Sequence, residues 1–177
     1  MSDRVEKVFL IGMMGVGKTT AGRLLAEALG WPQIDSDEEV VRVAGRPFAE
    51  LWEQGGESGF RSLEVKVVAD LASRPDQLVV ALGGGAVLDP RNREAIKSAG
   101  LVVWLRADPN TLTKRVGDGR GRPLLKGGPA KALNELSEAR APIYEGIADL
   151  VFDVDRVNPR EVARRVAKAV REHQCAS

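Results

Sequence analysis

The sequence predicts a doubly wound α/β domain, with a parallel sheet and helices on both of its faces. Short β-rich apolar runs alternate with helix-patterned stretches, and the links between them are short. The runs are continuously apolar, as in strands that helices cover on both sides. A chain of 177 residues is long enough for one domain with a full core and hardly for two.

Five apolar runs account for the strands. In chain order they are Val8–Ile11, Gln33–Asp35, Leu78–Leu82, Val102–Leu105 and Val151–Val154. The first run continues to Val16 and so has the length of a secretory signal core, but Asp3 and Glu6 precede it. A buried strand that enters a glycine-rich turn explains this run better.

Three stretches have helical periodicity. Thr20–Leu29 and Ser62–Leu71 each have one apolar face, and a final helix begins near Pro159. His173 and Cys175 are expected in a frayed tail. The residues expected on the buried faces are Leu24, Leu25, Ala28 and Leu29, then Leu63, Val67, Val68 and Leu71, and finally Val162, Val166 and Val170.

Composition excludes several classes of protein. Lys and Arg number 26 and Asp and Glu number 25, and the net charge of +1 argues against a dedicated nucleic-acid binder. With 44% hydrophobic and 29% charged residues the chain is not disordered, and no apolar run is long enough to span a bilayer. One cysteine and one histidine exclude a disulfide framework and a Cys-rich or multi-histidine metal site. We therefore expect a soluble, cytoplasmic protein.

The segment Gly12–Thr19, G-M-M-G-V-G-K-T, matches the P-loop pattern G-x-x-x-x-G-K-[ST]. It lies between a predicted strand and a predicted helix, which is the context that the motif requires. Its glycines let backbone N–H groups point at phosphate oxygens, and the start of the helix adds its dipole. Lys18 is expected to reach the β- and γ-phosphates and the Thr19 hydroxyl to bind Mg²⁺. The motif predicts nucleotide binding but not the reaction.

Two observations narrow the class of P-loop protein. No guanine-specifying N-K-x-D occurs, and the only D-x-x-G, Asp118–Gly121, does not follow a strand, which argues against a GTPase. A motor or large ATPase needs a longer chain. A kinase of a small molecule or nucleotide fits the length.

Asp35-Ser36-Asp37 follows the second predicted strand, at the sheet edge where doubly wound folds bind ligands. One carboxylate could serve a metal-bound water and the other a substrate hydroxyl. The alternative is a helix N-cap ahead of Glu38 and Glu39. The P-loop in the same chain favours the functional interpretation.

Two glycine-rich segments each have two interpretations. Gly83–Gly85 follows the third strand and either lets the backbone approach a ligand closely or forms a flexible turn. Gly117–Pro129 carries Arg120, Arg122 and Lys126 and is either an ordinary surface loop or a mobile basic lid over a phosphate site.

Two arginines complete the candidate set. Arg61 is expected at the start of a helix, with Glu57 and Glu64 in reach for surface ion pairs. Arg140 is expected before a helix end at a proline. Each alone is typical of a solvated side chain, but together they could clamp a carboxylate, for which the planar guanidinium is well shaped.

These pieces, in this order, resemble the shikimate kinase family. The matching motifs run through the whole chain and are G-M-M-G-V-G-K-T-T, D-S-D, G-R-P-F-A-E-L-W, G-E-S-G-F-R-S-L-E, L-G-G-G-A-V, R-G-R-P-L-L and A-R-A-P-I-Y. The resemblance implies a P-loop fold of the nucleoside-monophosphate-kinase-like type, with a five-stranded parallel sheet. It also implies one kinase domain over residues 1–177, with a substrate-binding segment at about 35–65 and a lid at about 117–129.

On the ATP side, the resemblance implies that Lys18 contacts the transferring phosphate, that Thr19 binds Mg²⁺ and that Asp35 holds a metal-bound water. Arg122, in the lid, would reach the phosphates. The full set implied for ATP is Gly15, Val16, Gly17, Lys18, Thr19, Thr20, Arg115, Arg122 and Pro159, of which Arg115 and the loop before Pro159 would flank the adenine.

On the acceptor side, the resemblance implies that Asp37 binds the shikimate hydroxyls and acts as base on the 3-hydroxyl. Arg61 and Arg140 would bind the carboxylate, and the backbone of Gly84, within the run Gly83, Gly84 and Gly85, would contact a hydroxyl. The implied reaction is ATP + shikimate → ADP + 3-phosphoshikimate, a step of aromatic amino-acid biosynthesis. Its catalytic residues would be Lys18, Asp37 and Arg122.

Two rival functions remain at the level of the sequence. A gluconate-type sugar-acid kinase would share the P-loop and the small size. A catalytically silent nucleotide-binding module is disfavoured by the intact Lys18, Thr19, Asp37 and Arg122. We expect a monomer that binds ATP and a small acid and has no nucleic-acid or membrane partner.

Overall fold

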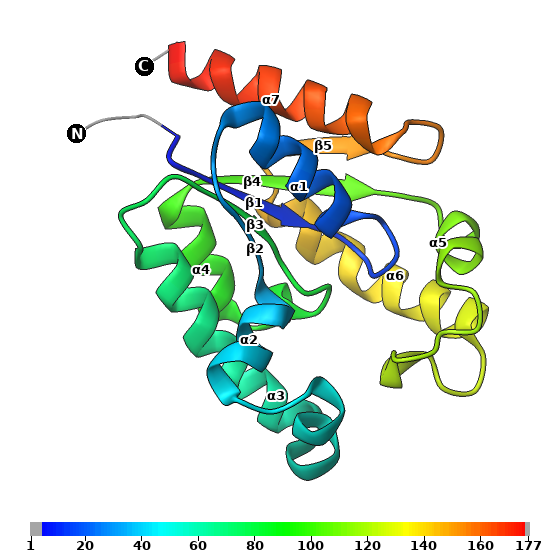
Figure 1. Cartoon of the computed structure of the whole chain (residues 1–177). Coiled ribbons are helices and arrows are strands. Elements are labelled where there is room, and N and C mark those ends of the chain that lie inside the picture. The colour runs from blue at the N-terminus through cyan, green and yellow to red at the C-terminus, as the bar shows by residue number, and fades with distance from the viewer. Residues whose placement is uncertain (1–4, 176–177) are drawn as a thin grey trace.

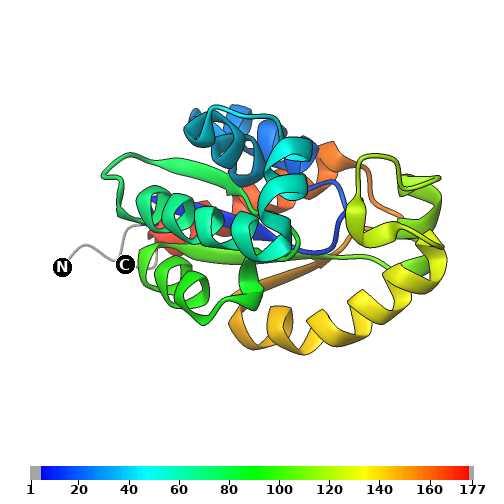
Figure 2. The ribbon, with the colours of Figure 1, turned by 90° about the horizontal axis from the view of Figure 1, so that it is seen from below.

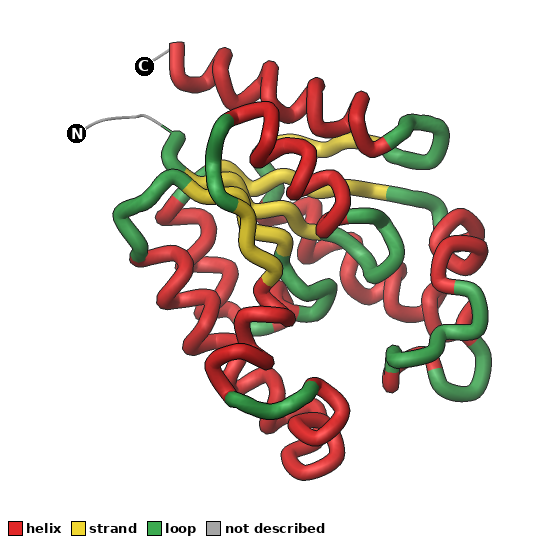
Figure 3. Tube along the Cα trace, in the orientation of Figure 1, coloured by secondary structure: helices red, strands yellow, loops and turns green. Residues whose placement is uncertain are grey.

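A five-stranded parallel sheet is the centre of the computed structural model, which describes residues 5–175 (Figures 1 and 3). The strands run in the order β2-β3-β1-β4-β5, and each neighbouring pair is parallel. Their bounds are β1 Lys7–Ile11, β2 Gln33–Asp35, β3 Leu78–Ala81, β4 Leu101–Arg106 and β5 Leu150–Asp153. All five coincide with the predicted runs to within one or two residues, and the predicted fold class is confirmed.

Helices cover both faces of this sheet. In Figure 1, α1 and α7 lie on one face and α3, α4 and α6 on the other, and Figure 2 views the molecule from the second side. The helices are α1 Lys18–Leu29, α2 Ser36–Ala44, α3 Phe48–Ser73, α4 Pro90–Ala99, α5 Pro109–Val116, α6 Pro129–Ile147 and α7 Pro159–Cys175, with short 3₁₀ turns at Ala86–Leu88 and Pro123–Leu125. Between residues 5 and 175, no helix is long and apolar enough to cross a membrane.

The core lies on the three middle strands. Every residue of β1 and β3 is buried, including Val8 and Phe9, which have no exposed surface. At the edge, β5 alternates between half-buried and exposed residues, and Val151 is 43% exposed. The expectation of burial on both faces is therefore wrong for β5, because the alternate side chains on one of its faces are exposed.

The buried face of α1 differs from the predicted one. It consists of Ala21, Gly22, Leu25 and Ala26, whereas Ala28 is exposed. Small side chains on this face let α1 lie close to β1, since a Cβ on Gly22 would come within 3.3 Å of the Leu10 side chain. Leu25 is buried as predicted, and Leu24 and Leu29 are half-buried against the core, so the prediction is wrong only for Ala28.

Of the two arginines predicted at helix boundaries, Arg140 lies inside a helix, and Arg61 lies shortly after a break in one, near its predicted position. Arg61 is within α3, five residues after Gly56, whose φ of 60° and ψ of −165° interrupt the helical geometry. Arg140 is within α6, which continues through Pro142 to Ile147, so the predicted end at the proline is wrong. Proline removes one intrahelical hydrogen bond, and the buried side chains of α6 outweigh that loss.

The C-terminal helix begins at Pro159, as predicted. The expectation that His173 lies in a frayed tail is wrong, because His173 is part of this helix. The helix α7 continues to Cys175, and His173 Nδ1 lies 2.9 Å from the carbonyl oxygen of Ala169, one turn earlier. The side chain of Cys175 lies outside the described part of the chain.

The fold brings the predicted site segments to one edge of the sheet. The loop after β1, the start of α2 after β2 and the glycine run after β3 all lie at the carboxyl ends of their strands. In Figure 1, α2 and α3 on one side and the segment after α5 on the other extend beyond this edge. The order of the strands reverses at β1, and ligands of open α/β sheets bind at this point.

Replacing Gly12 with alanine should destabilise the fold. Gly12 has a φ of +141°, and a Cβ there would clash with the backbone carbonyl of Leu105 at the end of β4. We expect Gly12→Ala to lower the free energy of unfolding by more than about 2 kcal/mol, measured by urea unfolding followed by circular dichroism. As the matched control, Gly59→Ala adds its Cβ to open space in α3 and should raise stability by up to about 1 kcal/mol. Equal stabilities of the two variants would contradict this account.

Candidate active site

The P-loop wraps around a buried lysine. Lys18 is the first residue of α1, and its ammonium group donates to the carbonyl oxygens of Gly12 (2.7 Å) and Met13 (3.0 Å). An ammonium group has three protons, so one stays available for an anionic ligand. Gly17 precedes the helix in the left-handed conformation, and no described side chain caps α1. The first N–H groups of α1 are therefore available to bind an anion as well.

The charge of Lys18 is sensitive to its surroundings. Burial lowers the pKa of Lys18 to about 8, and the nearby Asp37 and Asp35 oppose this shift. The ammonium form predominates at neutral pH, and phosphate oxygens beside it would raise this pKa further.

Thr19 and Asp35 contact each other directly. The Thr19 hydroxyl donates to Asp35 Oδ2 at 2.7 Å, while Asp35 Oδ1 accepts from the backbone N–H groups of Asp37 (3.0 Å) and Glu38 (3.5 Å). Asp35 thus caps α2 and also faces the P-loop, so the two interpretations of this residue are compatible. The described residues contain no group of three or more His, Cys, Asp or Glu side chains that could hold a metal by themselves.

A cavity of about 490 Å³ lies beside the start of α2, where Asp37 lines it, and has the size of a small-molecule site. One wall is apolar and consists of Phe48, Trp52 and Phe60, whose ring centroids are 5.1–6.0 Å apart. The residues predicted from the sequence that line the cavity are Asp37, Arg61, Gly83, Gly84, Gly85, Arg122 and Arg140.

Several polar atoms at this cavity are buried without a protein partner. They include Asp37 Oδ1, Arg61 Nε and Arg140 Nη1, and Glu64 Oε1 directly behind the glycine run. Buried polar atoms are almost always hydrogen-bonded, so such a cluster needs an explanation. These atoms would gain partners from a ligand whose hydroxyl groups donate to the carboxylates and whose anionic group accepts from the guanidinium groups.

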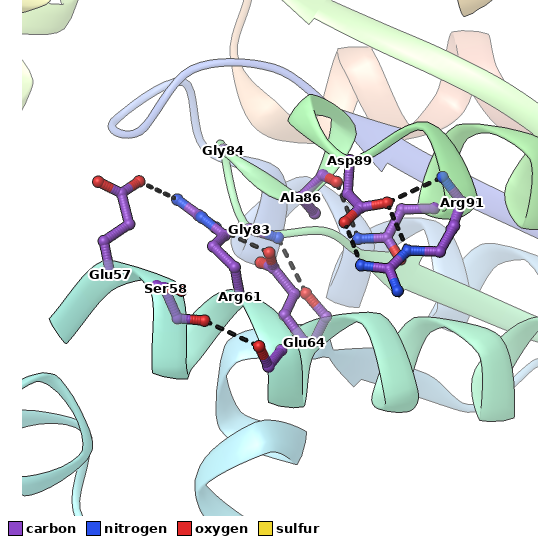
Figure 4. A network of polar contacts seen from close by, with 12 residues as sticks. Glu57, Ser58, Arg61, Glu64, Gly83, Gly84, Ala86, Asp89 and Arg91 are labelled. Carbon is purple, nitrogen blue, oxygen red and sulfur yellow. Dashed lines mark hydrogen bonds and ion pairs between the residues drawn. The ribbon is translucent and has the colours of Figure 1, made fainter. Parts of the chain in front are cut away.

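The orientation of Arg61 is set by two glutamates on its own helix. Its Nη1 donates to Glu64 Oε2 at 2.8 Å and its Nη2 to Glu57 Oε1 at 3.3 Å, as Figure 4 shows. The guanidinium carbon also lies 5.7 Å from the centroid of the Phe60 ring. These contacts occupy both terminal nitrogens of the guanidinium, whereas its Nε is buried without a protein partner.

The pKa values of two carboxyl groups in the site are raised above their ordinary values. Burial raises the pKa of Glu64 to about 7, against the pull of Arg61. Burial and the neighbouring charge of Asp35 raise the pKa of Asp37, whereas Lys18 and Arg61 oppose the rise. A carboxylate whose pKa is raised accepts a proton more readily, which suits a general base.

The glycine run contacts its neighbours through bare backbone. The Gly83 N–H donates to Ser36 Oγ at 2.9 Å, and the Gly84 carbonyl accepts from the Tyr144 hydroxyl at 2.5 Å. A Cβ at Gly83 would strike the carboxylates of Asp37 and Glu64, and one at Gly85 would strike the guanidinium of Arg61. A side chain at Gly83 or Gly85 would therefore displace charged groups of the site, and hydrogen bonds hold the run in the cavity wall.

A second cavity, of about 280 Å³, lies on the other side of the P-loop. Arg115 crosses it and donates to the carbonyl oxygens of Val16 (3.2 Å) and Val154 (3.0 Å). Pro159 and Thr20 also line it. The residues predicted for the acceptor thus line the larger cavity, and those predicted for ATP lie around the P-loop, except Arg122, which lines the larger cavity.

Sequence reasoning missed several residues of the site. Glu64 was considered only as a surface partner of Arg61, yet it has no exposed surface. The apolar wall was not predicted, although Phe48 and Trp52 are four residues apart and therefore share a helix face. Tyr144 follows Arg140 by four residues, and the same spacing could have placed it at the site.

Comparisons with known proteins agree with this geometry. A family model described as shikimate kinase matches residues 14–171. The shikimate kinase of Hahella chejuensis is 41% identical over 167 residues, which cover 94% of this chain and 86% of that protein.

Solved structures give the same result. A shikimate kinase from Acinetobacter baumannii, solved in complex with shikimate, has a TM-score of 0.92 and 35% identity, and the match covers 97% of this chain and 96% of that one. A gluconokinase from Sinorhizobium meliloti has a TM-score of 0.62 and 22% identity over 96% of this chain and 94% of its own, which shows a shared fold only. The extent of the family match and the identity over nearly the whole length show that this chain belongs to the shikimate kinase family.

Proposed function

We propose that this protein transfers the γ-phosphoryl group of ATP to the 3-hydroxyl of shikimate. Membership of the family supports ATP-dependent phosphorylation of shikimate. The observation that carries the assignment to this site is the set of unpartnered buried atoms in the cavity. Asp37 Oδ1 needs a hydroxyl donor, and Arg61 Nε and Arg140 Nη1 need an anionic acceptor. Shikimate has both kinds of group on one rigid ring.

The acceptor binds in the larger cavity. Arg61 and Arg140 bind the shikimate carboxylate, and Asp37 and the Gly84 backbone bind its hydroxyl groups. The aromatic wall of Phe48, Trp52 and Phe60 packs on the apolar parts of the ring, within a substrate-binding segment of about residues 35–65. Glu64, whose side chain is buried, holds Arg61 in place.

The donor half consists of the P-loop and the basic segment after α5. The first N–H groups of α1 and the ammonium of Lys18 bind the ATP phosphates, and Arg122, which lines the larger cavity, reaches the phosphates from the lid. Arg115 and Pro159 flank the adenine in the smaller cavity. Residues 117–129 act as the lid, and residues 1–177 form one kinase domain.

The residues at the P-loop also fit Mg²⁺. The ion prefers hard oxygen ligands, keeps several waters and usually takes only one or two carboxylates besides phosphate oxygens. The adjacent oxygens of Thr19 and Asp35 match that preference, with Thr19 as a ligand and Asp35 accepting from a metal-bound water. When bound, the ion would neutralise charge on the phosphates.

The chemistry follows from these positions. The 3-hydroxyl oxygen attacks the γ-phosphorus, the bond from that phosphorus to the β–γ bridging oxygen breaks, and Asp37 accepts the proton. Transfer of this kind needs in-line positioning and cations on the developing charge, which Lys18 and Arg122 supply. Closure of the lid keeps out water that would otherwise receive the phosphoryl group. A monomeric state and a cytoplasmic location remain predictions of the sequence.

Acceptor specificity tests the proposal directly. Release of ADP should be measured in a coupled assay with shikimate, with gluconate and without an acceptor. We expect turnover with shikimate at least about 100-fold above the other two, because each unpaired buried polar group disfavours the wrong acceptor. Equal turnover with gluconate would favour the sugar-acid kinase, and no turnover with any acceptor would favour the silent nucleotide-binding module.

The role of Asp37 is tested by Asp37→Asn. This variant keeps the shape of the side chain and removes the proton acceptor, so kcat should fall at least about 100-fold while the dissociation constant of ATP changes little. Both quantities are measured at the same pH, by the coupled assay and by calorimetry. Glu135→Gln, at a side chain that is 67% exposed, is the matched control and should leave kcat unchanged. Retained turnover in Asp37→Asn would exclude the base role.

The pH dependence of ATP use tests Lys18. The pKa of Lys18 is about 8 without ATP, so the ammonium predominates below this pH and the neutral amine above it. We expect kcat/KM for ATP, at saturating shikimate, to fall as the pH rises through about 8, since this constant reports on the enzyme before ATP binds. Circular dichroism at pH 9.5 serves as a control for unfolding. A kcat/KM that stays constant up to pH 9.5 would contradict the assignment.

A further inference from the structure

We infer that Ser36 and Tyr144 are positioning residues for the acceptor, because they hold the glycine run Gly83–Gly85 from two sides and so set the direction of the Gly84 N–H. This inference rests on the proposed function. Neither side chain lines the larger cavity, so neither is expected to contact the acceptor itself. Each would act through the backbone of the run.

The run has no side chains of its own to keep it in place. Instead, one hydrogen bond holds each of its peptide planes. Ser36 Oγ accepts from the Gly83 N–H at 2.9 Å, the Gly83 carbonyl accepts from the Ala86 N–H at 3.0 Å, and the Gly84 carbonyl accepts from the Tyr144 hydroxyl at 2.5 Å. The plane that contains the Gly84 N–H lies between the planes held by Ser36 and Tyr144. Within residues 5–175 this N–H donates to no backbone acceptor, so it is available to a ligand.

Tyr144 couples the run to two other parts of the site. It is 1% exposed, its ring centroid lies 5.6 Å from that of Trp104, and its hydroxyl oxygen is 3.8 Å from Met13 Sδ in the P-loop. Burial raises the pKa of Tyr144 to about 12, so the hydroxyl stays protonated and remains a donor. Arg140 lies four residues earlier on the same face of α6. One helix face thus carries a carboxylate-binding arginine and the group that orients the glycine run.

Ser36 couples the run to the two aspartates. It has no exposed surface, it is the first residue of α2, and it lies between Asp35 and Asp37 in the chain. A shift of the run would therefore displace Asp37 Oδ1, because this atom lies so close to Gly83 that no Cβ fits between them. The position of the backbone donor and that of the carboxylate are set together.

Hydroxyl deletions separate positioning from general packing. Tyr144→Phe and Ser36→Ala each remove one hydroxyl oxygen and add no atom that could clash with the main chain. We expect KM for shikimate to rise about tenfold in each variant, the effect of one net hydrogen bond, while KM for ATP stays within about twofold of the wild-type value. Binding of shikimate without ATP, measured by calorimetry, should weaken by the same factor.

Controls distinguish the outcomes. Ser98→Ala removes an exposed serine hydroxyl that donates to the Glu94 carbonyl at 2.8 Å, away from the site, and should change neither KM. If Tyr144→Phe does not fold, Ser36→Ala decides the question alone. An unchanged KM for shikimate, or equal rises in both KM values, would overturn the inference. Wild-type protein that does not phosphorylate shikimate at all would instead overturn the proposed function.

Discussion

The parallel pairing of β1 with β3 is the constraint on which the rest of the site depends. Leu10 pairs with Ala81, so the two strands end at the same level and their loops emerge side by side. One loop is the P-loop and the other is the glycine run. They approach so closely that a Cβ on Gly84 would lie 3.3 Å from the Met14 nitrogen and 3.4 Å from the Gly12 oxygen. Bare backbone on both loops is what allows a phosphate donor and an acceptor to lie next to each other.

The parallel pairing of β2 with β3 places the two carboxylates of the D-S-D segment at the same edge of the sheet. Asp35 pairs with Ala81 at the end of β2, which places Asp35 opposite Thr19 and directs Asp37 toward Gly83. Lys18 is buried and Asp37 is half-buried, so their charges act on one another more strongly than they would at the surface. The raised pKa of Asp37 and the lowered pKa of Lys18 both follow from burial in this environment. The net charge of +1 is a sum over the whole chain. It does not reveal that four cationic side chains lie at this site, namely Lys18, Arg61, Arg122 and Arg140.

Sequence reasoning succeeded where the signal is local. The P-loop, the strand runs and the D-S-D segment depend on residues that are neighbours in the chain, and the structure brings them to one sheet edge. It was wrong where packing decides. In α1, Ala28 is exposed, whereas Ala21, Gly22 and Ala26 are buried by the neighbouring elements. The helix α6 continues through Pro142 because its buried side chains stabilise a helix that local propensity would end. Burial of Glu64 could not be predicted either, since an arginine–glutamate spacing on a helix is the same in solvent and in a core.

The sequence by itself determined the class of fold, the phosphate-binding loop and the types of side chain available for chemistry, because periodicity and motif spacing encode these along the chain. Only the tertiary structure decided which of those side chains face one cavity and which polar atoms lack a partner there. It also decided that Ser36 and Tyr144, 108 residues apart in the numbering, hold the same three glycines. Such contacts depend on the distance between segments after folding, and no local pattern of residues specifies that distance.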